Sequence, residues 1–274
     1  MGTGRYGSEG LRGMRRREEV GLLAQLLDLI HSTLEIFDLE AAPLGLSVNW
    51  KKTKIQSLSD CGPDIADLVV HGDTVEAVEE FVYLGAKIPR SCRSSPEISR
   101  RIGMTHQAMK DLDIPIWRSK LTFATKIRLY NTFVLHVLMY GSEAWTMTAS
   151  DSAKLDACDQ SCLRKICGVH WSQHVTNAEI RRRTGQLPVS KLIAKRRLEL
   201  FGHIARSDPA SDTRRAVAAT APRDWRRPRG RPRNTWRSTV EADVAPLNFG
   251  LHTAWRRAQD RTFWRTATLR ATLP

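Results

Sequence analysis

The chain has 274 residues, of which 41% are hydrophobic, so it can bury a core, and its composition argues against wholesale disorder. Its formal charge is +14. The excess lies in residues 181–274, which hold 22 lysines and arginines against 7 acidic residues, a charge of +15. This distribution excludes an evenly basic protein. It predicts a near-neutral body followed by a segment that contacts polyanions.

The sequence also lacks the marks of a membrane or secreted protein. No stretch reaches the roughly 18 apolar residues that cross a bilayer. The N-terminus is rich in Gly and Arg and has no apolar signal segment. Five cysteines, an odd number without framework spacing, indicate reduced thiols. We therefore expect an intracellular protein, and a nuclear one if its polyanion is nucleic acid.

The first third of the chain predicts a helix and then a small antiparallel β-element. After a disordered segment (1–17), apolar residues recur at steps of three and four from Val20 to Phe37, which indicates a helix that Pro43 ends. Weak alternation and a Gly-Asp turn predict the β-element over about 46–88. The expected strands and turns are two strands in 46–58 around Lys51-Lys52, a strand at 68–71, a turn at Gly72-Asp73 and a strand at 81–88.

From Ser95-Pro96 onward the pattern is helical, so the predicted fold class is α+β and mostly α-helical. Ser150 is the expected cap of the third of these helices. Residues 207–235, rich in Pro, Arg, Ala and Asp, predict a linker. The expected helices cover 97–112, 123–141, 150–166, 176–184, 189–205, 234–244 and 251–269.

Two groups of residues could hold a metal. Adjacent carboxylates at Glu18 and Glu19 could bind Mg²⁺. Acidic residues in a first helical turn also complement the helix dipole, and we favour this structural interpretation. A cluster of thiols and imidazoles has spacing unlike common zinc sites, and its first two members continue an apolar helical stripe. The cluster is Cys158, Cys162, Cys167, His170 and His174. We assign no metal to either group.

The sharpest local signal is the segment RPRGRPR at 227–233, in which arginines alternate with Pro and Gly. It resembles the AT-hook, an extended ribbon that enters the A·T minor groove. A solvated Arg-Pro linker has the same composition. The expected nucleic-acid-binding residues are Arg227, Arg229, Gly230, Arg231, Pro232, Arg233 and Arg237.

Five Trp-Arg pairs occur, four of them in the basic third of the chain. Aromatic rings beside arginine can stack on bases while the guanidinium contacts phosphate. The alternative is a helix that buries the Trp and exposes its neighbour. The sequence contains no GxSxG, Walker A, HExxH or Rossmann fingerprint that would indicate another enzyme class.

Eight segments in collinear order resemble the reverse transcriptases of non-LTR (LINE-like) retrotransposons, in the part that follows the catalytic palm motif. The resemblance covers about residues 18–265. The segments are LGLSVNWKKTKIQSL (44–58), EEFVYLGAKI (79–88), EISRRIGMTHQAM (97–109), TKIRLYNTFVLHVLMYGSEAW (125–145), CLRKICGVHWSQHVTNAEIRRRTG (162–185), RRLELFGHIAR (196–206), GRPRNTW (230–236) and AQDRTFWR (258–265).

The resemblance implies roles for several residues. Asn49, Lys52 and Thr53 match a palm motif near the incoming nucleotide, and Tyr83, Leu84 and Gly85 match the strand that grips the primer. The implied regions are a palm remnant (18–93), thumb-like helices (94–145), a helical C-terminal region (146–206), a basic linker (207–235) and C-terminal helices (236–274).

The departures from the family decide what activity to expect. The family's Asp-Asp pair corresponds to Glu18 and Glu19, preceded by arginines, and longer side chains are poor substitutes where two metals need tight positioning. Upstream palm residues are not part of this sequence, which leaves open a longer chain. We therefore expect an inactive fragment of an RNA-directed DNA polymerase that binds RNA or DNA, with Mg²⁺ needed only for any residual polymerase activity. The alternative is a nuclear DNA-binding module that uses the AT-hook-like segment.

This truncation also predicts a loosely packed N-terminal half, because the small sheet would lack its partner strands.

Overall fold

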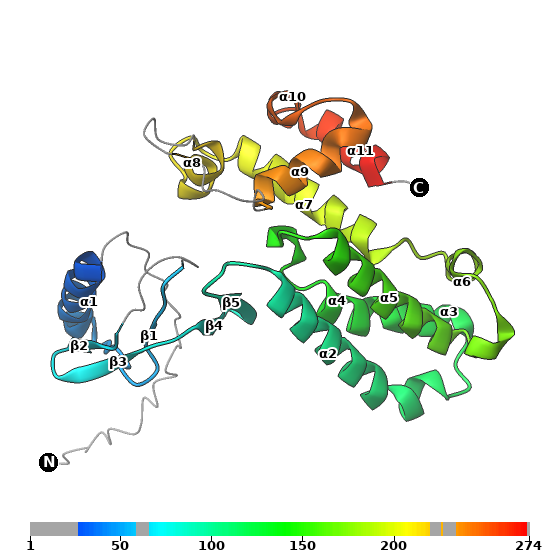
Figure 1. The fold of residues 1–274 in the computed structure, drawn as a ribbon, viewed down its shortest axis with the longest axis horizontal. Coiled ribbons are helices and arrows are strands. Elements are labelled where there is room, and N and C mark those ends of the chain that lie inside the picture. The colour runs from blue at the N-terminus through cyan, green and yellow to red at the C-terminus, as the bar shows by residue number, and fades with distance from the viewer. Residues whose placement is uncertain (1–26, 59–65, 220–225, 227–233, 273–274) are drawn as a thin grey trace, which may run out of the picture. The chain divides into compact units, whose positions relative to one another are not determined.

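The structure is a computed structural model that describes residues 27–58, 66–219, 226 and 234–272 (Figure 1). The chain forms two compact units, Met1–Gly85 and Ala86–Pro274. Helices dominate the described residues and strands are few, which confirms the predicted mostly helical α+β class. None of the described helices has the length and apolarity needed to cross a membrane.

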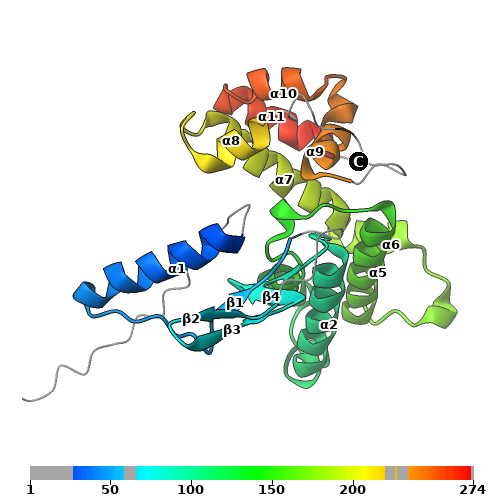
Figure 2. The same ribbon diagram turned by 60° about the vertical axis from the view of Figure 1, so that its left-hand side comes forward.

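The first unit combines one helix with a small sheet, and α1 lies beside that sheet (Figure 2). The predicted hairpin is confirmed, because β2 and β3 are antiparallel with Val70 opposite Asp73. Its turn lies at His71 and Gly72, one residue before the expected position, since Asp73 begins β3. The β1 strand instead pairs parallel to β3, so the sheet is mixed. Its order is β1-β3-β2. The elements are α1 (Leu27–Ala41), a 3-10 turn (Ala42–Leu44), β1 (Lys54–Ile55), β2 (Leu68–Val70), β3 (Asp73–Ala77) and β4 (Glu80–Tyr83).

Two strand predictions in this region were wrong. Residues 46–49 form no strand, because the backbone at Asn49 is folded into a turn that precedes β1. The expected strand over 81–88 is a hairpin in which β4 pairs with β5 (Ala86–Pro89). Its turn lies at Leu84 and Gly85, whose φ angles of 47° and 79° are both left-handed and reverse the chain.

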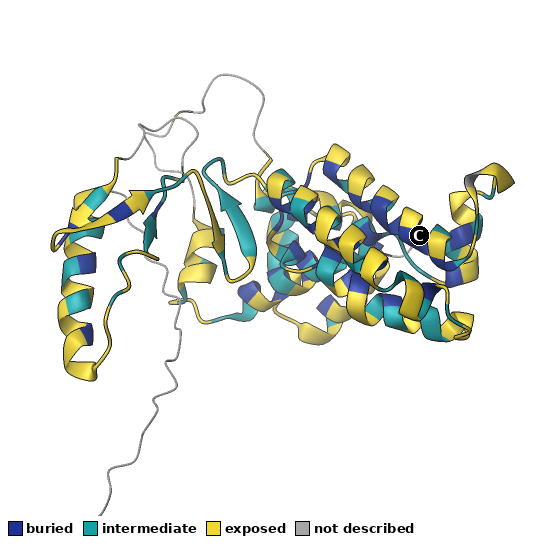
Figure 3. Ribbon diagram, turned by 90° about the horizontal axis from the view of Figure 1, so that it is seen from below, coloured by how far each residue is buried: buried dark blue, intermediate teal, exposed yellow. Residues whose placement is uncertain are grey.

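The core of the first unit is small. Leu34, Ile55, Val70 and Val75 form its buried cluster. Many large apolar side chains of the same unit remain exposed, and most of α1 is exposed in Figure 3. They are Leu27, Leu29, Ile36, Phe37, Leu39, Leu44, Leu46, Leu58, Val69, Phe81, Val82 and Leu84. The expected exposure of apolar surface in the N-terminal part is therefore confirmed for the described residues.

The second unit is helical, and the helices expected from periodicity are confirmed with three corrections. Thr148, not Ser150, caps α5, in a capping box with Asp151. The predicted linker contains helix α8, and the last predicted helix divides into α10 and α11 because Asp260 caps a new start. The helices are α2 (Ser95–Asp111), α3 (Phe123–Leu129), α4 (Leu135–Leu138), α5 (Ala149–Ile166), α6 (Asn177–Thr184), α7 (Val189–Arg206), α8 (Asp212–Ala218), α9 (Trp236–Val244), α10 (Leu251–Arg257) and α11 (Arg261–Thr272).

Shorter helical turns join these helices. A π-helical turn links α3 to α4, so the predicted helix over 123–141 is interrupted but continuous in direction. The short elements are π-helical turns at Asp113–Trp117 and Tyr130–Val134, and 3-10 turns at Ser142–Ala144, Trp171–Gln173 and Ala245–Leu247.

Helix α7 contributes to two hydrophobic cores. Val189 and Ile193 belong to the core formed with α2–α6, whereas Leu198 and Phe201 belong to the core formed with α9–α11. The buried side chain of Arg197 lies between these two sets. Its Nε donates to Asp243 Oδ2 at 2.6 Å, and its Nη1 donates to the Trp145 carbonyl at 2.9 Å. The guanidinium thus ties α7 to α9 and to the loop before α5.

A glycine in α7 allows the second core to close. The indole of Trp264 in α11 packs against Gly202 and donates from Nε1 to the Leu198 carbonyl at 2.8 Å. A Cβ atom at position 202 would lie 2.3 Å from Trp264 Cδ1. The two segments FGHIAR and TFWR, far apart in sequence, therefore fit together only with glycine at this position.

An ionic cluster is buried at the start of α2. Glu97 accepts hydrogen bonds from Arg101 Nε at 2.6 Å, from Arg100 Nε at 2.7 Å and from the Lys87 backbone N–H at 2.9 Å. Burial alone would raise the pKa of Glu97, but these hydrogen bonds together lower it from its usual value of 4.5. The guanidinium of Arg101 also lies 4.5 Å from the centre of the Tyr140 ring.

Glu97→Gln should lower the free energy of unfolding by about 3 kcal/mol at pH 7, because it leaves Arg101 buried without its carboxylate. The stabilisation by an acid of lowered pKa is present above its unfolded-state pKa and is lost as pH falls through the folded-state value. The difference between variant and wild type should therefore shrink below pH 4.5. Urea unfolding across this range measures it; a pH-independent difference contradicts the account.

Gly202→Ala should destabilise the chain by about 1–3 kcal/mol, because the Trp264 ring must move. Gly103→Ala in α2 is the matched control, since no atom lies within 4 Å of the added Cβ. That exposed helical change should stabilise by about 0.5–1 kcal/mol. Thermal unfolding of both variants compares them, and equal effects at the two positions would refute the packing described for α7 and α11.

Candidate nucleic-acid interface

The predicted nucleotide-contacting residues lie in one tight turn before β1. The Asn49 carbonyl accepts from the backbone N–H groups of Lys52 and Thr53, both at 2.9 Å. Thr53 Oγ1 donates to the same carbonyl at 3.0 Å, and Asn49 Oδ1 accepts from Lys52 N at 3.2 Å. The structure thus brings Asn49, Lys52 and Thr53 together. The side chain of Asn49 shapes the turn, as asparagine commonly does, and Lys52 is exposed on it.

The predicted primer-contacting residues lie at another turn. Tyr83 ends β4, and Leu84 and Gly85 form the left-handed turn of the β4–β5 hairpin. Leu84 is 60% exposed. A hairpin tip can bring backbone close to a ligand, but the nucleotide and primer roles of both turns remain predictions.

Most of the predicted nucleic-acid-binding residues lie outside the described residues. They are Arg227, Arg229, Gly230, Arg231, Pro232 and Arg233. The carboxylates Glu18 and Glu19 also lie outside the described residues. Arg237 is described: it is exposed near the start of α9, and its Nη1 donates to the Ala219 carbonyl at 3.0 Å.

Cys158 and Cys162, the first two members of the thiol and imidazole cluster, belong to the buried side of α5. Cys158 and Cys162 are buried with Leu155 and Ile166, which confirms the apolar-stripe interpretation. The hydrogen bond with Cys158 and burial raise the pKa of Cys162, so this thiol stays protonated at neutral pH. His106 Nε2 lies 3.5 Å from Cys158 Sγ. Within the described ranges, no three His, Cys, Asp or Glu side chains gather closely enough to hold a metal ion.

A second buried polar group lies beside these cysteines. Asp159 accepts a hydrogen bond from the Tyr130 hydroxyl and pairs with Arg181 of α6. Burial raises the pKa of Asp159, although its two partners oppose that shift. Burial and the neighbouring carboxylate raise the pKa of Tyr130. This network joins α5, α6 and the π-turn between α3 and α4, and its buried position suits a structural role.

The tryptophans of the Trp-Arg pairs point inward. Trp117 and Trp264 are buried and Trp236 and Trp255 are half-buried, while the arginine after each is exposed. Trp236 Nε1 donates to the Glu143 carbonyl at 2.8 Å, and Trp117 Nε1 donates to the Met109 carbonyl at 3.0 Å. The described pairs therefore fit the alternative interpretation, a helix that buries Trp beside an exposed Arg.

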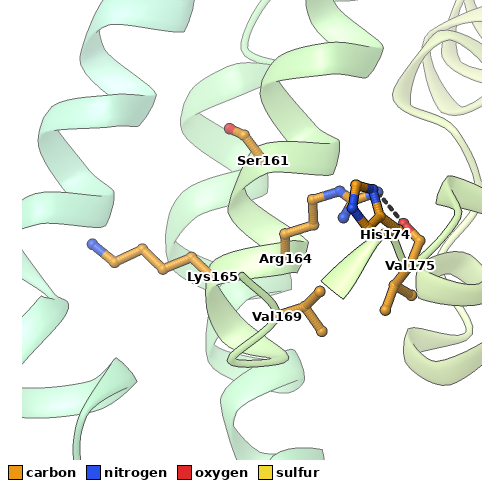
Figure 4. Close-up of a pocket in the computed structure, with 6 residues that line it drawn as sticks. All are labelled: Ser161, Arg164, Lys165, Val169, His174 and Val175. Atoms are coloured by element: carbon orange, nitrogen blue, oxygen red, sulfur yellow. Dashed lines mark hydrogen bonds between the residues drawn. The ribbon is translucent and has the colours of Figure 1, made fainter. Parts of the chain in front are cut away.

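A shallow pocket of about 590 Å³ lies at the C-terminal end of α5 (Figure 4). Arg164 Nη2 donates to the Val175 carbonyl at 2.6 Å and to Asn177 Oδ1 at 2.9 Å. These two hydrogen bonds connect α5 to the start of α6. Lys165 Nζ pairs with Asp113 Oδ1 at 3.0 Å. Both cations are engaged within the protein. The lining residues are Ser161, Arg164, Lys165, Val169, His174 and Val175.

Sequence reasoning missed the arginines of α10 and α11 as a surface. Arg256, Arg261, Arg265 and Arg270 are exposed. The signal available in the sequence was that the arginines of α11 fall outside the helical stripe formed by Trp264, Ala267 and Ala271. These arginines and the exposed Lys52 turn are the described groups best suited to contact phosphate.

Comparison with known proteins links the chain to mobile elements. It is 25% identical over 280 residues to an uncharacterized transposon-derived protein of Caenorhabditis elegans, and the match covers 98% of this chain and 99% of that protein. No family model matches the chain, and no solved structure matches it. The chain is therefore related along almost its whole length to a transposon-derived protein.

Proposed function

We propose that the chain derives from the end of the palm, the thumb and the C-terminal extension of a non-LTR retrotransposon reverse transcriptase, and that it binds RNA or DNA without polymerase activity. The transposon-derived relative supports the origin. The eight collinear segments support the more specific assignment. The observation that carries the binding function is the charge of +15 on residues 181–274 beside a near-neutral body.

The chemistry of this charge favours phosphate as the ligand. Arginine outnumbers lysine 20 to 2 in residues 181–274. The planar guanidinium donates in a bidentate manner to phosphate and stays charged at every physiological pH. Several of these arginines are instead engaged within the protein: Arg181, Arg196, Arg197 and Arg206 bond to internal groups. Arg182 and Arg183 pair with Glu179. The exposed remainder supplies the charge that a polyanion would meet.

The expected loss of polymerase activity rests on Glu18 and Glu19. Two-metal phosphoryl transfer requires carboxylates that hold the ions about 3.5–4 Å apart. Each glutamate carries one methylene more than aspartate, and Arg15–Arg17 precede the pair. Such a pair holds two metals poorly, so binding without extension is the expected behaviour.

The purified chain should bind an RNA–DNA hybrid with an affinity that falls steeply with salt, and should add no nucleotides to its primer in the presence of Mg²⁺. Fluorescence anisotropy and primer extension on the same substrate measure both. Robust incorporation would overturn the inactivity, and lack of binding at low salt would overturn the binding function.

The AT-hook alternative predicts a different pattern in the same assay. Arg229→Ala/Arg231→Ala would then weaken binding to A·T-rich duplexes alone. The proposed function predicts a uniform and modest loss on A·T- and G·C-rich duplexes.

A further inference from the structure

Helix α11 has two sides of opposite character. Its buried side packs Trp264, Ala267 and Ala271 into the core with α7. Its exposed side carries Arg261, Arg265 and Arg270. Arg261 and Arg265 lie one turn apart, whereas Arg270, nine residues after Arg261, projects about 180° around the helix from it, at the other edge of the exposed side and about 13.5 Å along the axis. We call these three residues the α11 arginine face.

The charge of this face is not neutralised by the protein. In the part of the chain that the structure describes, no acidic group lies within ion-pairing distance of Arg261, Arg265 or Arg270, and α11 itself contains no acidic residue. The nearby Asp260 is engaged, because its Oδ1 accepts from the backbone N–H groups of Thr262 and Phe263. Other exposed arginines differ: Arg182 and Arg183 both pair with Glu179, and Arg118 pairs with Asp113.

The position of Arg261 adds to the positive potential. It lies in the first turn of α11, where the helix dipole is itself positive and a cation is unfavourable. An anion at this end would be attracted by both the guanidinium and the dipole. This arrangement suits a bound polyanion better than it suits the stability of the free helix.

The described Trp and Phe rings of the same region are engaged within the protein. Trp264 and Trp236 donate to backbone carbonyls within the protein, and Trp255 packs edge-on against Phe201 at 5.5 Å. The guanidinium of Arg257 covers the Phe263 ring at 4.8 Å. Binding of single strands usually depends on the stacking of bases on aromatic side chains. This surface can therefore contact phosphates but offers no free Trp or Phe ring as a platform for bases.

We propose that the α11 arginine face binds the phosphate backbone of double-stranded nucleic acid and does not read its bases. This inference rests on the proposed function and assigns the duplex contact to residues outside the segment at 227–233. A duplex presents one negative charge per about 1.7 Å of its axis, so the length of α11 from Arg261 to Arg270 faces several phosphates. The exposed hydroxyl-bearing Thr262 lies on the same side.

The test compares two triple variants of the full chain that lose the same charge. Arg261→Gln/Arg265→Gln/Arg270→Gln removes the unpaired face, and Arg118→Gln/Arg182→Gln/Arg183→Gln removes exposed arginines that are ion-paired. Duplex affinity is measured between about 50 and 200 mM salt. The α11 variant should bind at least about tenfold more weakly, with a salt slope shallower by about 2–3. The control should stay within about threefold of wild type, since surface ion pairs contribute little.

Two further measurements separate loss of binding from loss of folding. Circular dichroism melting checks that both variants fold. The variant Arg261→Lys/Arg265→Lys/Arg270→Lys should restore most of the salt slope, because lysine keeps the positive charge that contacts phosphate. If the wild-type chain binds duplex and the α11 variant keeps the full affinity and salt slope, this inference is overturned and the proposed function stands. Tighter binding to single strands than to duplex also overturns it. Failure of wild type to bind any nucleic acid overturns both.

Discussion

The arrangement of the helices in the second unit depends on the hydrogen bonds that the buried guanidinium of Arg197 donates. A fully buried cation needs partners, and Arg197 has Asp243 from α9 and the Trp145 carbonyl from the segment before α5. Its neighbours along α7 enter two different cores, with Ile193 in one and Leu198 in the other. Arg197 therefore fixes the register of α7 against both cores and ties α9 to the segment before α5.

The outer surface of the second core follows from this constraint. Because α7 presents Phe201 and Gly202 to the C-terminal helices, the indoles of Trp255 and Trp264 are drawn inward. The arginines that follow these tryptophans must then face solvent. The packing of one helix thus determines that this region presents cationic groups and turns its Trp rings into the core, which is the basis of our proposal of a phosphate contact without base recognition.

The segments that resemble a reverse transcriptase acquire physical roles in the same framework. Arg164 binds the Val175 carbonyl and Asn177, which closes the loop between α5 and α6. Arg196 donates to the Met139 carbonyl at the end of the segment that contains α3 and α4. In the described part of the second unit these segments supply internal contacts that hold its helices together.

Sequence alone predicted the long helices well, because Leu155, Cys162 and Ile166 repeat at the helical period and bury one stripe. Prediction from sequence was wrong where one residue determines the local backbone conformation. The turn at Asn49 depends on hydrogen bonds that its carbonyl accepts from the backbone N–H groups of Lys52 and Thr53. The hairpin at Leu84 depends on a left-handed φ that alternation does not reveal. The direction of each Trp depends on which helices meet, and the paired or unpaired state of each arginine depends on tertiary neighbours. Composition therefore indicated a polyanion partner but not the surface that meets it.

The most direct test is a map of arginine reactivity on the intact chain with and without duplex, read by mass spectrometry after modification with a dicarbonyl reagent. The account predicts that duplex protects Arg261, Arg265 and Arg270, that Arg118 and Arg182 stay equally reactive, and that buried Arg197 is unreactive in both states. Unchanged reactivity of the α11 arginines in a duplex-saturated sample would contradict the account.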